Sequence, residues 1–157
     1  MMLGCAMLDG RSGHDAGREL LAQLFRQETG EELPDIEIDR WGKPYFPDSP
    51  WFFSISHTQR RVFCALSRKK VGIDAEELDR PVRLALADKV LSDFERAQFD
   101  VAENPRQALL TFWVLKEAAA KLAGTGLRGY PNHTAFTLED SRVQIRDGCI
   151  LAVLTEE

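Results

Sequence analysis

The chain has 157 residues, of which 44% are hydrophobic, and a formal net charge of −5. A chain of this length can bury one sizeable core. Its acidic balance excludes a general nucleic-acid binder, which needs a broad basic surface. It contains no run of the roughly 20 apolar residues that a membrane-spanning helix requires. We therefore expect a soluble protein that binds neither nucleic acid nor membranes.

The three cysteines indicate a cellular compartment. Cys5, Cys64 and Cys149 are odd in number, widely separated and embedded in apolar stretches. This pattern favours reduced core thiols over a disulfide framework or a zinc site, and predicts a cytoplasmic protein. The opening "MMLGCAMLDG" has a short apolar run with no positively charged region before it, so it predicts a first strand rather than a targeting segment.

The first half of the chain predicts a helix, a strand and a hairpin. Apolar residues recur at helical spacing from Asp15 to Thr29, and Gly30 follows as a stop. "DIEIDRW" then alternates apolar and polar residues as a strand does. "RVFCALSRKKVGIDAEE" predicts two strands, 62–67 and 71–76, joined by a polar turn.

The second half predicts the same order of elements. "LSDFERAQFD" is typical of a helix capped by Ser92 with Glu95 three residues later, and Pro105 opens a longer helix that "GTG" ends near Gly124. "TAFTLED" predicts another strand. "RVQIRDGCILAVL" contains the Asp-Gly turn of a tight hairpin.

Because both halves repeat one pattern, although no residue-level repeat is visible, we expect an α+β fold of two pseudo-related halves packed around a shared cleft. The halves are residues 1–80 and 81–157. With both halves in one chain, an active site between subunits is unnecessary, and we expect a monomer.

The stretch "VGIDAEELDR" ends an apolar run in two carboxylates. Asp74 and Glu76 are two residues apart, so on a strand they project from one side, about 7 Å apart along the backbone. They would repel each other unless a cation lies between them, which suggests a hard divalent ion. The alternative is that the chain here simply leaves the sheet for solvent, and this stretch alone does not decide between the two.

The predicted long helix carries an acid and a base on one side. Trp113, Glu117 and Lys121 in "FWVLKEAAAKLAGTGL" are spaced i, i+4 and i+8. A purely structural interpretation is also open, because Glu followed four residues later by Lys is an ordinary helix-stabilising pair and a tryptophan one turn earlier is usually core.

Two further stretches hold candidate binding residues. "WGKPYF" places Lys43 between Gly42 and Pro44 on a restrained loop, where it either binds a ligand or is merely solvated. "FSISHT" places Ser56 beside His57. Adjacent strand residues face opposite ways, so these two cannot form a nucleophile–base pair, and His57 is either a ligand-binding residue or a satisfied strand-end histidine.

The order of these motifs is more specific than any one of them. "GKP", "SISHT", "VGIDAEE" and "FWVLKEAAAKLAGTGL" resemble, in order and spacing, the successive motifs of the 4′-phosphopantetheinyl transferase superfamily, in a short form of its larger, pseudo-dimeric, surfactin-synthetase-activating type. The Gly-Ile-Asp-x-Glu and Trp-x-x-Lys-Glu-x-x-x-Lys signatures are the specific part of this resemblance. Gly-Lys-Pro alone would be weak.

The resemblance implies an activity. Members of the family transfer 4′-phosphopantetheine from coenzyme A to a serine of an apo acyl or peptidyl carrier protein of fatty-acid, polyketide or nonribosomal-peptide synthesis, releasing 3′,5′-ADP. It implies that Asp74, Glu76 and Glu117 bind Mg²⁺, with Mn²⁺ as a substitute. Glu117 would take the proton of the serine, and Lys121 would stabilise charge on the transferring phosphate.

The resemblance also implies which residues bind coenzyme A. These are Arg18, Lys43, Pro44, Ser56, His57 and Lys116. Two positions depart from the family pattern. Longer members carry a basic stretch between the first strand and the first helix, where this chain has little more than "DGRSGHD", and Ser54 stands where the family usually has Asn.

A second function class is a non-catalytic module that binds coenzyme A or a carrier protein, as the shortened N-terminal region suggests. The chain keeps all three carboxylates and Lys121. A module that only binds would have little use for a cluster of like charges, which costs free energy. The sequence therefore favours the transferase.

Overall fold

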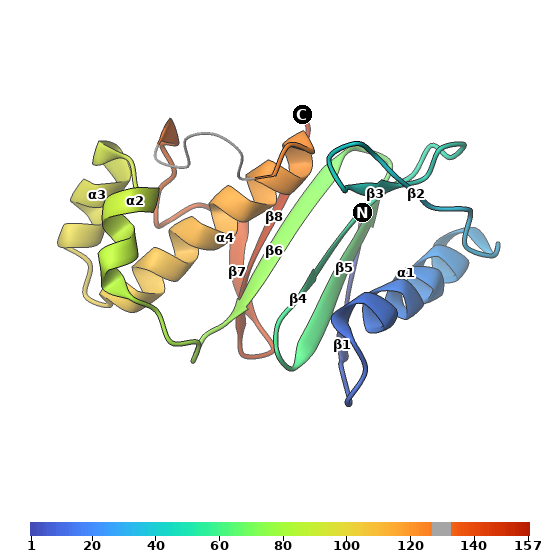
Figure 1. The fold of residues 1–157 in the computed structure, drawn as a ribbon, viewed down its shortest axis with the longest axis horizontal. Helices are drawn as coiled ribbons and strands as arrows, with labels where there is room; N and C mark the ends of the chain where they lie inside the picture. Colours follow the sequence, from blue (N-terminus) through green and yellow to red (C-terminus); the bar gives the residue numbers. More distant parts are fainter. Residues whose placement is uncertain (127–132) are drawn as a thin grey trace.

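The computed structural model of the chain describes residues 1–126 and 133–157, and shows the expected α+β fold (Figure 1). The helices are α1 (Gly13–Thr29), α2 (Ala87–Val90), α3 (Asp93–Asp100) and α4 (Pro105–Ala123), with a 3-10 turn η1 (Leu84–Leu86). The strands are β1 (Met2–Met7), β2 (Glu37–Ile38), β3 (Pro44–Tyr45), β4 (Phe52–His57), β5 (Arg61–Ser67), β6 (Val71–Glu77), β7 (Val143–Arg146) and β8 (Cys149–Thr155). None of the helices in the described ranges is long and apolar enough to cross a membrane.

The predicted helix ends are confirmed by their caps. α1 ends at Gly30, which adopts a left-handed conformation with φ of 76°. Ser92 and Glu95 form the expected capping box at the start of α3. α4 begins at Pro105 and ends at Ala123, and Gly124, which follows it, is again left-handed. Local sequence signals therefore set the bounds of the helix that carries Glu117 and Lys121.

The predicted pairing of strands 62–67 and 71–76 in one hairpin is wrong. Within the described residues, one antiparallel sheet has the order β1-β5-β4 and another the order β6-β8-β7. The turn between β5 and β6 carries the chain from the first sheet to the second, where β6 can pair with β8 and also be covered by α4. The division of the chain at residue 80 stays a prediction, although β6, which precedes it, hydrogen-bonds to a C-terminal strand.

Two other predicted strands also differ. "TAFTLED" is not a strand, because its backbone is satisfied by side chains of α3: the amide of Phe136 donates to Glu95, and that of Leu138 to Gln98. "DIEIDRW" contributes only β2, which pairs with β3. The Asp147–Gly148 hairpin joining β7 and β8 is confirmed, with both turn residues at positive φ.

The elements stack in layers, with strands lying between α1 and α4 (Figure 1). α1 packs on the outer face of β1-β5-β4, and α4 on the outer face of β6-β8-β7. The inner faces of the two sheets share an apolar cluster. This cluster contains Phe63, Ala65, Val71, Ile73, Ala75, Cys149 and Leu151. Cys64 and Cys149 are buried free thiols, and Cys5 is partly buried.

Strand β6 uses its two faces differently. Val71, Ile73 and Ala75 face the inner cluster. The alternate residues, Gly72 and Asp74, therefore face α4. Both faces of β6 are therefore buried, one against the inner cluster and the other against α4.

Side-chain hydroxyls connect the two sheets along one edge. Ser54 Oγ accepts a hydrogen bond from the amide of Ile73 at 3.0 Å, and Ser56 Oγ accepts one from the amide of Ala75 at 3.1 Å. These contacts replace a backbone ladder between β4 and β6, and so hold the edge of β4 beside the residues of β6 that face α4.

Gly72 allows α4 to lie directly on the backbone of β6. A Cβ built at Gly72 would lie 2.1 Å from the carbonyl oxygen of Ala118 and 2.4 Å from the amide nitrogen of Leu122. These neighbours are helix backbone, which cannot turn aside as a side chain can. Any larger residue must therefore push α4 away from the strand.

We predict that Gly72→Ala destabilises the protein by at least about 1–3 kcal/mol, the usual cost of overpacking a close-packed interior. The measurement is the urea midpoint of unfolding. Gly4→Ala is the matched control, because its Cβ would meet only side-chain atoms of Leu20 and Leu24, at 3.1 Å or more. Equal midpoints for the two variants would show that the contact of α4 with β6 is looser than described.

Candidate active site

Asp74 lies at the junction of β4, β6 and α4. It is 7% exposed, so at this residue the chain does not leave the sheet for solvent. Its Oδ1 accepts hydrogen bonds from Ser56 Oγ at 3.1 Å and from Lys121 Nζ at 3.0 Å. Burial raises the pKa of Asp74, and the neighbouring Lys121 ammonium opposes this rise. Its other oxygen, Oδ2, is buried and has no hydrogen-bond partner among the described residues.

Glu117 and Lys121 lie on the side of α4 that faces this junction. Lys121 forms its ion pair with Asp74 on β6, and also approaches the carbonyl of Ile55 on β4 at 3.4 Å. The main contact of Lys121 is therefore with β6, and not with Glu117 four residues earlier on the same helix. Glu117 is partly buried, and its pKa is raised by burial and then by the charge of Asp74.

Glu76 is the third carboxylate of this group. Its charge contributes to the raised pKa values of both Asp74 and Glu117, after burial and other neighbours. The three carboxylates therefore share one electrostatic environment. Glu76 is paired with Arg80, which lies on the turn that follows β6.

Asp74, Glu76 and Glu117 supply oxygen donors that suit a hard divalent cation, although two of the three are paired with cationic side chains. Across residues 1–126 and 133–157, no three acidic, histidine or cysteine side chains are grouped as a formed metal site. Asp74 and Glu76 are instead neutralised by Lys121 and Arg80. Carboxylate oxygens are the ligands that Mg²⁺ prefers, and the unpartnered Oδ2 of Asp74 is a free donor of this kind.

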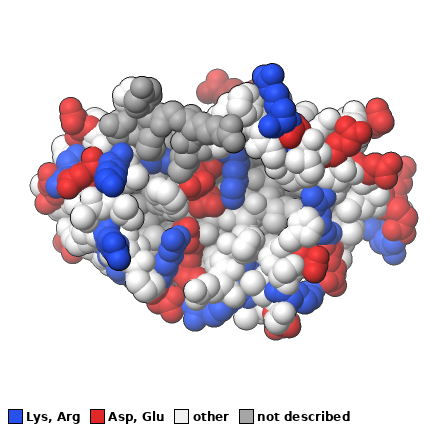
Figure 2. Space-filling view, in the orientation of Figure 1, with Lys and Arg blue, Asp and Glu red and all other residues white. Residues whose placement is uncertain are grey.

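Two cavities are lined in part by residues of β4. The larger, of about 680 Å³, is lined by residues that include His57, Thr58, Glu76 and Arg80. The smaller, of about 250 Å³, has among its lining residues Lys43, Pro44, Ser54, Ile55 and Lys121. Figure 2 shows acidic and basic side chains meeting near the middle of this face, where α4 and β6 lie in Figure 1.

Lys43 reaches the C-terminal end of α4. Its Nζ donates a hydrogen bond to the carbonyl oxygen of Lys121 at 2.6 Å, and burial lowers its pKa. Gly42, with φ of 85°, makes the turn that precedes Lys43, and Pro44 begins β3. The "GKP" loop is therefore held against the helix that carries Glu117, and is not simply solvated.

His57 lies beside the N-terminus of α1. Its side chain is exposed whereas Ser56 is buried, as expected for adjacent strand residues. A Cβ built at Gly13 would lie 2.3 Å from Cγ of His57, so the imidazole is in close contact with the first residue of α1. Arg18 is partly exposed on the same helix. Sequence reasoning missed Gly13, which becomes recognisable only when α1 is placed against β4.

Lys116 does not point into this site, and we withdraw it as a coenzyme A contact. Its side chain is 1% exposed, and Nζ donates to Glu95 Oε1 at 2.6 Å and also to Thr134. Glu95 is itself fully buried at the start of α3. Lys116 is one residue, or about 100° of helical rotation, from Glu117, so it faces α3 while Glu117 faces β6.

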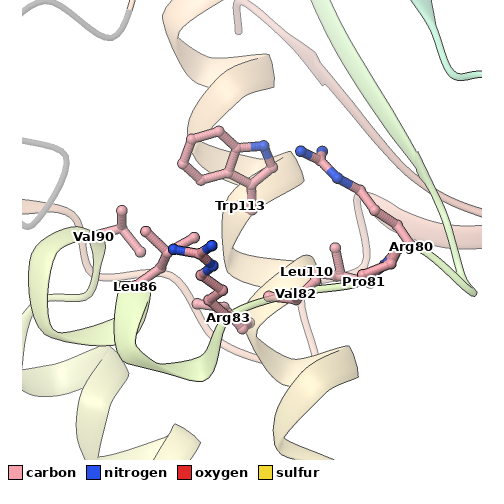
Figure 3. Close-up of a pocket in the computed structure, with 9 residues that line it drawn as sticks. Arg80, Pro81, Val82, Arg83, Leu86, Val90, Leu110 and Trp113 are labelled. Carbon is pink, nitrogen blue, oxygen red and sulfur yellow. The ribbon is translucent and has the colours of Figure 1, made fainter.

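A groove next to the acidic cluster was not predicted. It has a volume of about 230 Å³ and is mostly apolar (Figure 3). Its lining residues are Arg80, Pro81, Val82, Arg83, Leu86, Val90, Leu109, Leu110 and Trp113. Trp113 is only partly buried and contributes to this surface. The arginines of "DRPVR" are the sequence signal that could have indicated it.

Comparisons with known proteins agree with the motifs. Residues 70–150 match the model of the 4′-phosphopantetheinyl transferase superfamily. The chain is 36% identical over 144 residues to a 4′-phosphopantetheinyl transferase of Bacillus subtilis, a match that covers 85% of this chain and 60% of the relative. It is 30% identical over 143 residues to 4′-phosphopantetheinyl transferase psf-1 of Bacillus pumilus, covering 84% of this chain and 61% of that protein.

A third relative is 4′-phosphopantetheinyl transferase Sfp of Bacillus subtilis strain 168, which is 34% identical over 116 residues. That match covers 71% of this chain and 51% of the relative. The aligned part of the chain thus spans between half and two thirds of the length of these relatives. The family model alone matches more than half of the chain and includes both β6 and α4. The chain therefore belongs to the 4′-phosphopantetheinyl transferase superfamily.

Proposed function

We propose that this chain transfers 4′-phosphopantetheine from coenzyme A to a serine of an acyl or peptidyl carrier protein and releases 3′,5′-ADP. The observation that carries the proposal is the junction of β6 and α4. There the buried Asp74, with a free carboxylate oxygen, lies against Lys121, and its charge acts on Glu117. Phosphoryl transfer depends mainly on positioning and charge stabilisation, which such a junction can supply.

Asp74, Glu76 and Glu117 would hold Mg²⁺, or Mn²⁺ in its place. When bound, the cation supplies neutralising charge at the pyrophosphate of coenzyme A as the phosphoanhydride bond breaks. Glu117 would accept the proton of the carrier serine. Its raised pKa suits this role, because a base is most effective when its pKa lies nearer the working pH. The Lys121 ammonium would stabilise negative charge on the transferring phosphate.

Coenzyme A would lie along the β4–β6 edge, with its nucleotide end held by Lys43, Pro44 and His57, and Arg18 nearby on α1. Both cavities described above are lined by residues of β4, and the larger one also by residues of β6. A direct contact between Ser56 and coenzyme A would require an exposed hydroxyl. The side chain of Ser56 is instead buried, and its hydroxyl donates to Asp74. We therefore propose that Ser56 orients the carboxylate, and that the exposed His57 contacts the nucleotide.

The groove beside Trp113 suits a carrier protein, because these partners are small and acidic. It combines apolar lining with the exposed Arg80 and Arg83, and it adjoins Glu76 through the Arg80 ion pair (Figure 3).

We further propose that the protein works in the cytoplasm as a monomer, with its active site between the halves 1–80 and 81–157. The free, mostly buried cysteines support the reducing compartment.

Glu117→Gln separates a chemical role from a structural one. The substitution keeps the shape of the side chain but removes its charge, so we expect transfer to slow by about 10²–10⁴-fold, the usual contribution of a general base. The urea midpoint should stay close to that of the unchanged protein. Transfer is measured as 3′,5′-ADP released from coenzyme A in the presence of Mg²⁺ and an apo-carrier protein.

Glu103→Gln is the matched control for this variant, because it removes an exposed carboxylate in the loop before α4. It should change neither quantity. If Glu117→Gln unfolds readily but keeps normal turnover per folded molecule, Glu117 is a structural residue and the proposed chemistry is wrong.

Lys43→Ala tests recognition of the nucleotide. A charge-assisted hydrogen bond to phosphate is worth roughly 1.5–3 kcal/mol, so its loss should lower kcat/KM for coenzyme A by about ten- to a hundredfold. Dephospho-coenzyme A, which lacks the 3′-phosphate, should lose much less. We therefore expect the unchanged protein to prefer coenzyme A and the variant to use both substrates almost equally.

The ratio of the two substrates is an internal control for folding. Lys43 also hydrogen-bonds to the end of α4, and damage to that contact would reduce turnover of both substrates by the same factor. Equal losses would assign Lys43 to the structure of the helix end. They would remove it from the nucleotide site while leaving the proposed metal chemistry intact.

A further inference from the structure

Two of the three carboxylates proposed to bind the metal are already paired with cations. Asp74 is paired with Lys121, which lies on α4 and is fixed by a second contact to the carbonyl of Ile55. Glu76 is paired with Arg80, whose side chain is 52% exposed. The two cations therefore differ in freedom: Lys121 projects from a packed helix, while Arg80 projects from a turn.

The backbone of Arg80 is fixed by hydrogen bonds on both sides, whereas its side chain has a single ion pair. Its amide donates to the carbonyl of Glu77 at 3.0 Å, and its own carbonyl accepts from Arg106 at 3.0 Å. Within the part of the chain that the structure describes, the side chain of Arg80 bonds only to Glu76. The guanidinium can therefore leave this carboxylate without any change in the path of the chain.

Arg80 also lies at the boundary of two concave surfaces. It lines the cleft that contains His57 and Glu76, and it lines the groove that contains Trp113. Figure 3 shows the guanidinium extending along α4 beside the indole of Trp113. A guanidinium released from Glu76 thus already borders the surface of this groove.

We propose that Arg80 is a built-in counter-ion for Glu76 that competes with the metal for this carboxylate and is displaced when the metal binds. The inference rests on the proposed function, since it requires Glu76 to be a metal ligand. Without a metal, Arg80 neutralises Glu76 and relieves repulsion among three neighbouring carboxylates. With a metal bound, a guanidinium beside a divalent cation is repelled, so its release toward the groove is favoured.

Competition of this kind makes a prediction opposite to that for an ordinary supporting residue. A residue that positions a metal ligand weakens metal binding when it is removed. A competitor strengthens binding when it is removed, because the metal no longer has to displace it. The free energy of a half-exposed ion pair is small, so we expect Arg80→Gln to tighten metal binding by about two- to fivefold.

The test is a titration with Mn²⁺ at saturating coenzyme A, in which free Mn²⁺ is followed by its electron paramagnetic resonance signal. Coenzyme A without protein gives the blank. The proteins compared are the unchanged chain, Arg80→Gln, Arg80→Lys, Arg83→Gln and Asp74→Asn. Arg83→Gln is the matched control, because it removes an equal charge from the same groove, and Arg83 has no ion pair within the described parts of the chain.

The expected result is tighter Mn²⁺ binding for Arg80→Gln alone, with Arg80→Lys and Arg83→Gln close to the unchanged protein and Asp74→Asn much weaker. Equal tightening in Arg80→Gln and Arg83→Gln would reduce the effect to general charge and overturn the proposal. Unchanged or weaker binding in Arg80→Gln would also overturn it while leaving the metal site in place. If the unchanged protein binds no Mn²⁺ above the blank, the metal site falls and the inference falls with it.

Discussion

The site depends on the backbone contact between α4 and β6 at Gly72. Because Gly72 has no Cβ, Ala118 and Leu122 can lie directly over the strand. At this separation Lys121 reaches Asp74, and Glu117 enters the field of the carboxylates on β6. A wider spacing would leave the acids of the strand and those of the helix as two unrelated groups. The glycine of the Gly-Ile-Asp-x-Glu signature is thus as much a part of the site as its acids.

A second constraint holds the site from the other side. The hydroxyls of Ser54 and Ser56 bond to backbone amides of β6, so the edge of β4 is fixed beside Asp74. Ser56 also donates to Asp74 itself. A serine at position 54, where the family resemblance leads one to expect Asn, is sufficient for the one contact with Ile73 that is seen here. His57, the proposed nucleotide contact, then follows on the opposite face of the same strand.

The electrostatic state of the cluster follows from this packing. Burial raises the pKa values of Asp74 and Glu117, the charge of Glu76 raises both further, and the charge of Asp74 also raises that of Glu117. Lys121 offsets part of this cost from α4, and Arg80 pairs with Glu76 from the turn after β6. Opposing charges therefore already surround the acids before any ligand is present. This explains how the protein can fold with two carboxylates on β6 whose charges act on a third on α4.

The parts of this structure that depend on local signals could be predicted from the sequence. Ser92, Pro105 and the glycines that end α1 and α4 set the helix bounds, and the spacing of Glu117 and Lys121 placed them on one side of α4. The partner of β6 could not be predicted, because pairing with β8 depends on contacts more than seventy residues away in the chain.

Lys116 shows the same limit within one helix. The family resemblance implied a coenzyme A contact for this residue, but the element that faces Lys116 decides its role. Glu95 on α3 takes the Lys116 ammonium into the core, while β6 takes Lys121. Arg80 was overlooked for a related reason, since nothing in "DRPVR" shows that the turn returns the guanidinium to Glu76.

The most direct test of the account is the intact mass of an apo-carrier protein after incubation with this chain, coenzyme A and Mg²⁺. The account predicts that the carrier gains the mass of one phosphopantetheine group, attached to a serine, and that Asp74→Asn abolishes the gain. A carrier that keeps its original mass, although the chain is folded and binds coenzyme A, would contradict it. The junction of β6 and α4 would then be the binding surface of a non-catalytic module.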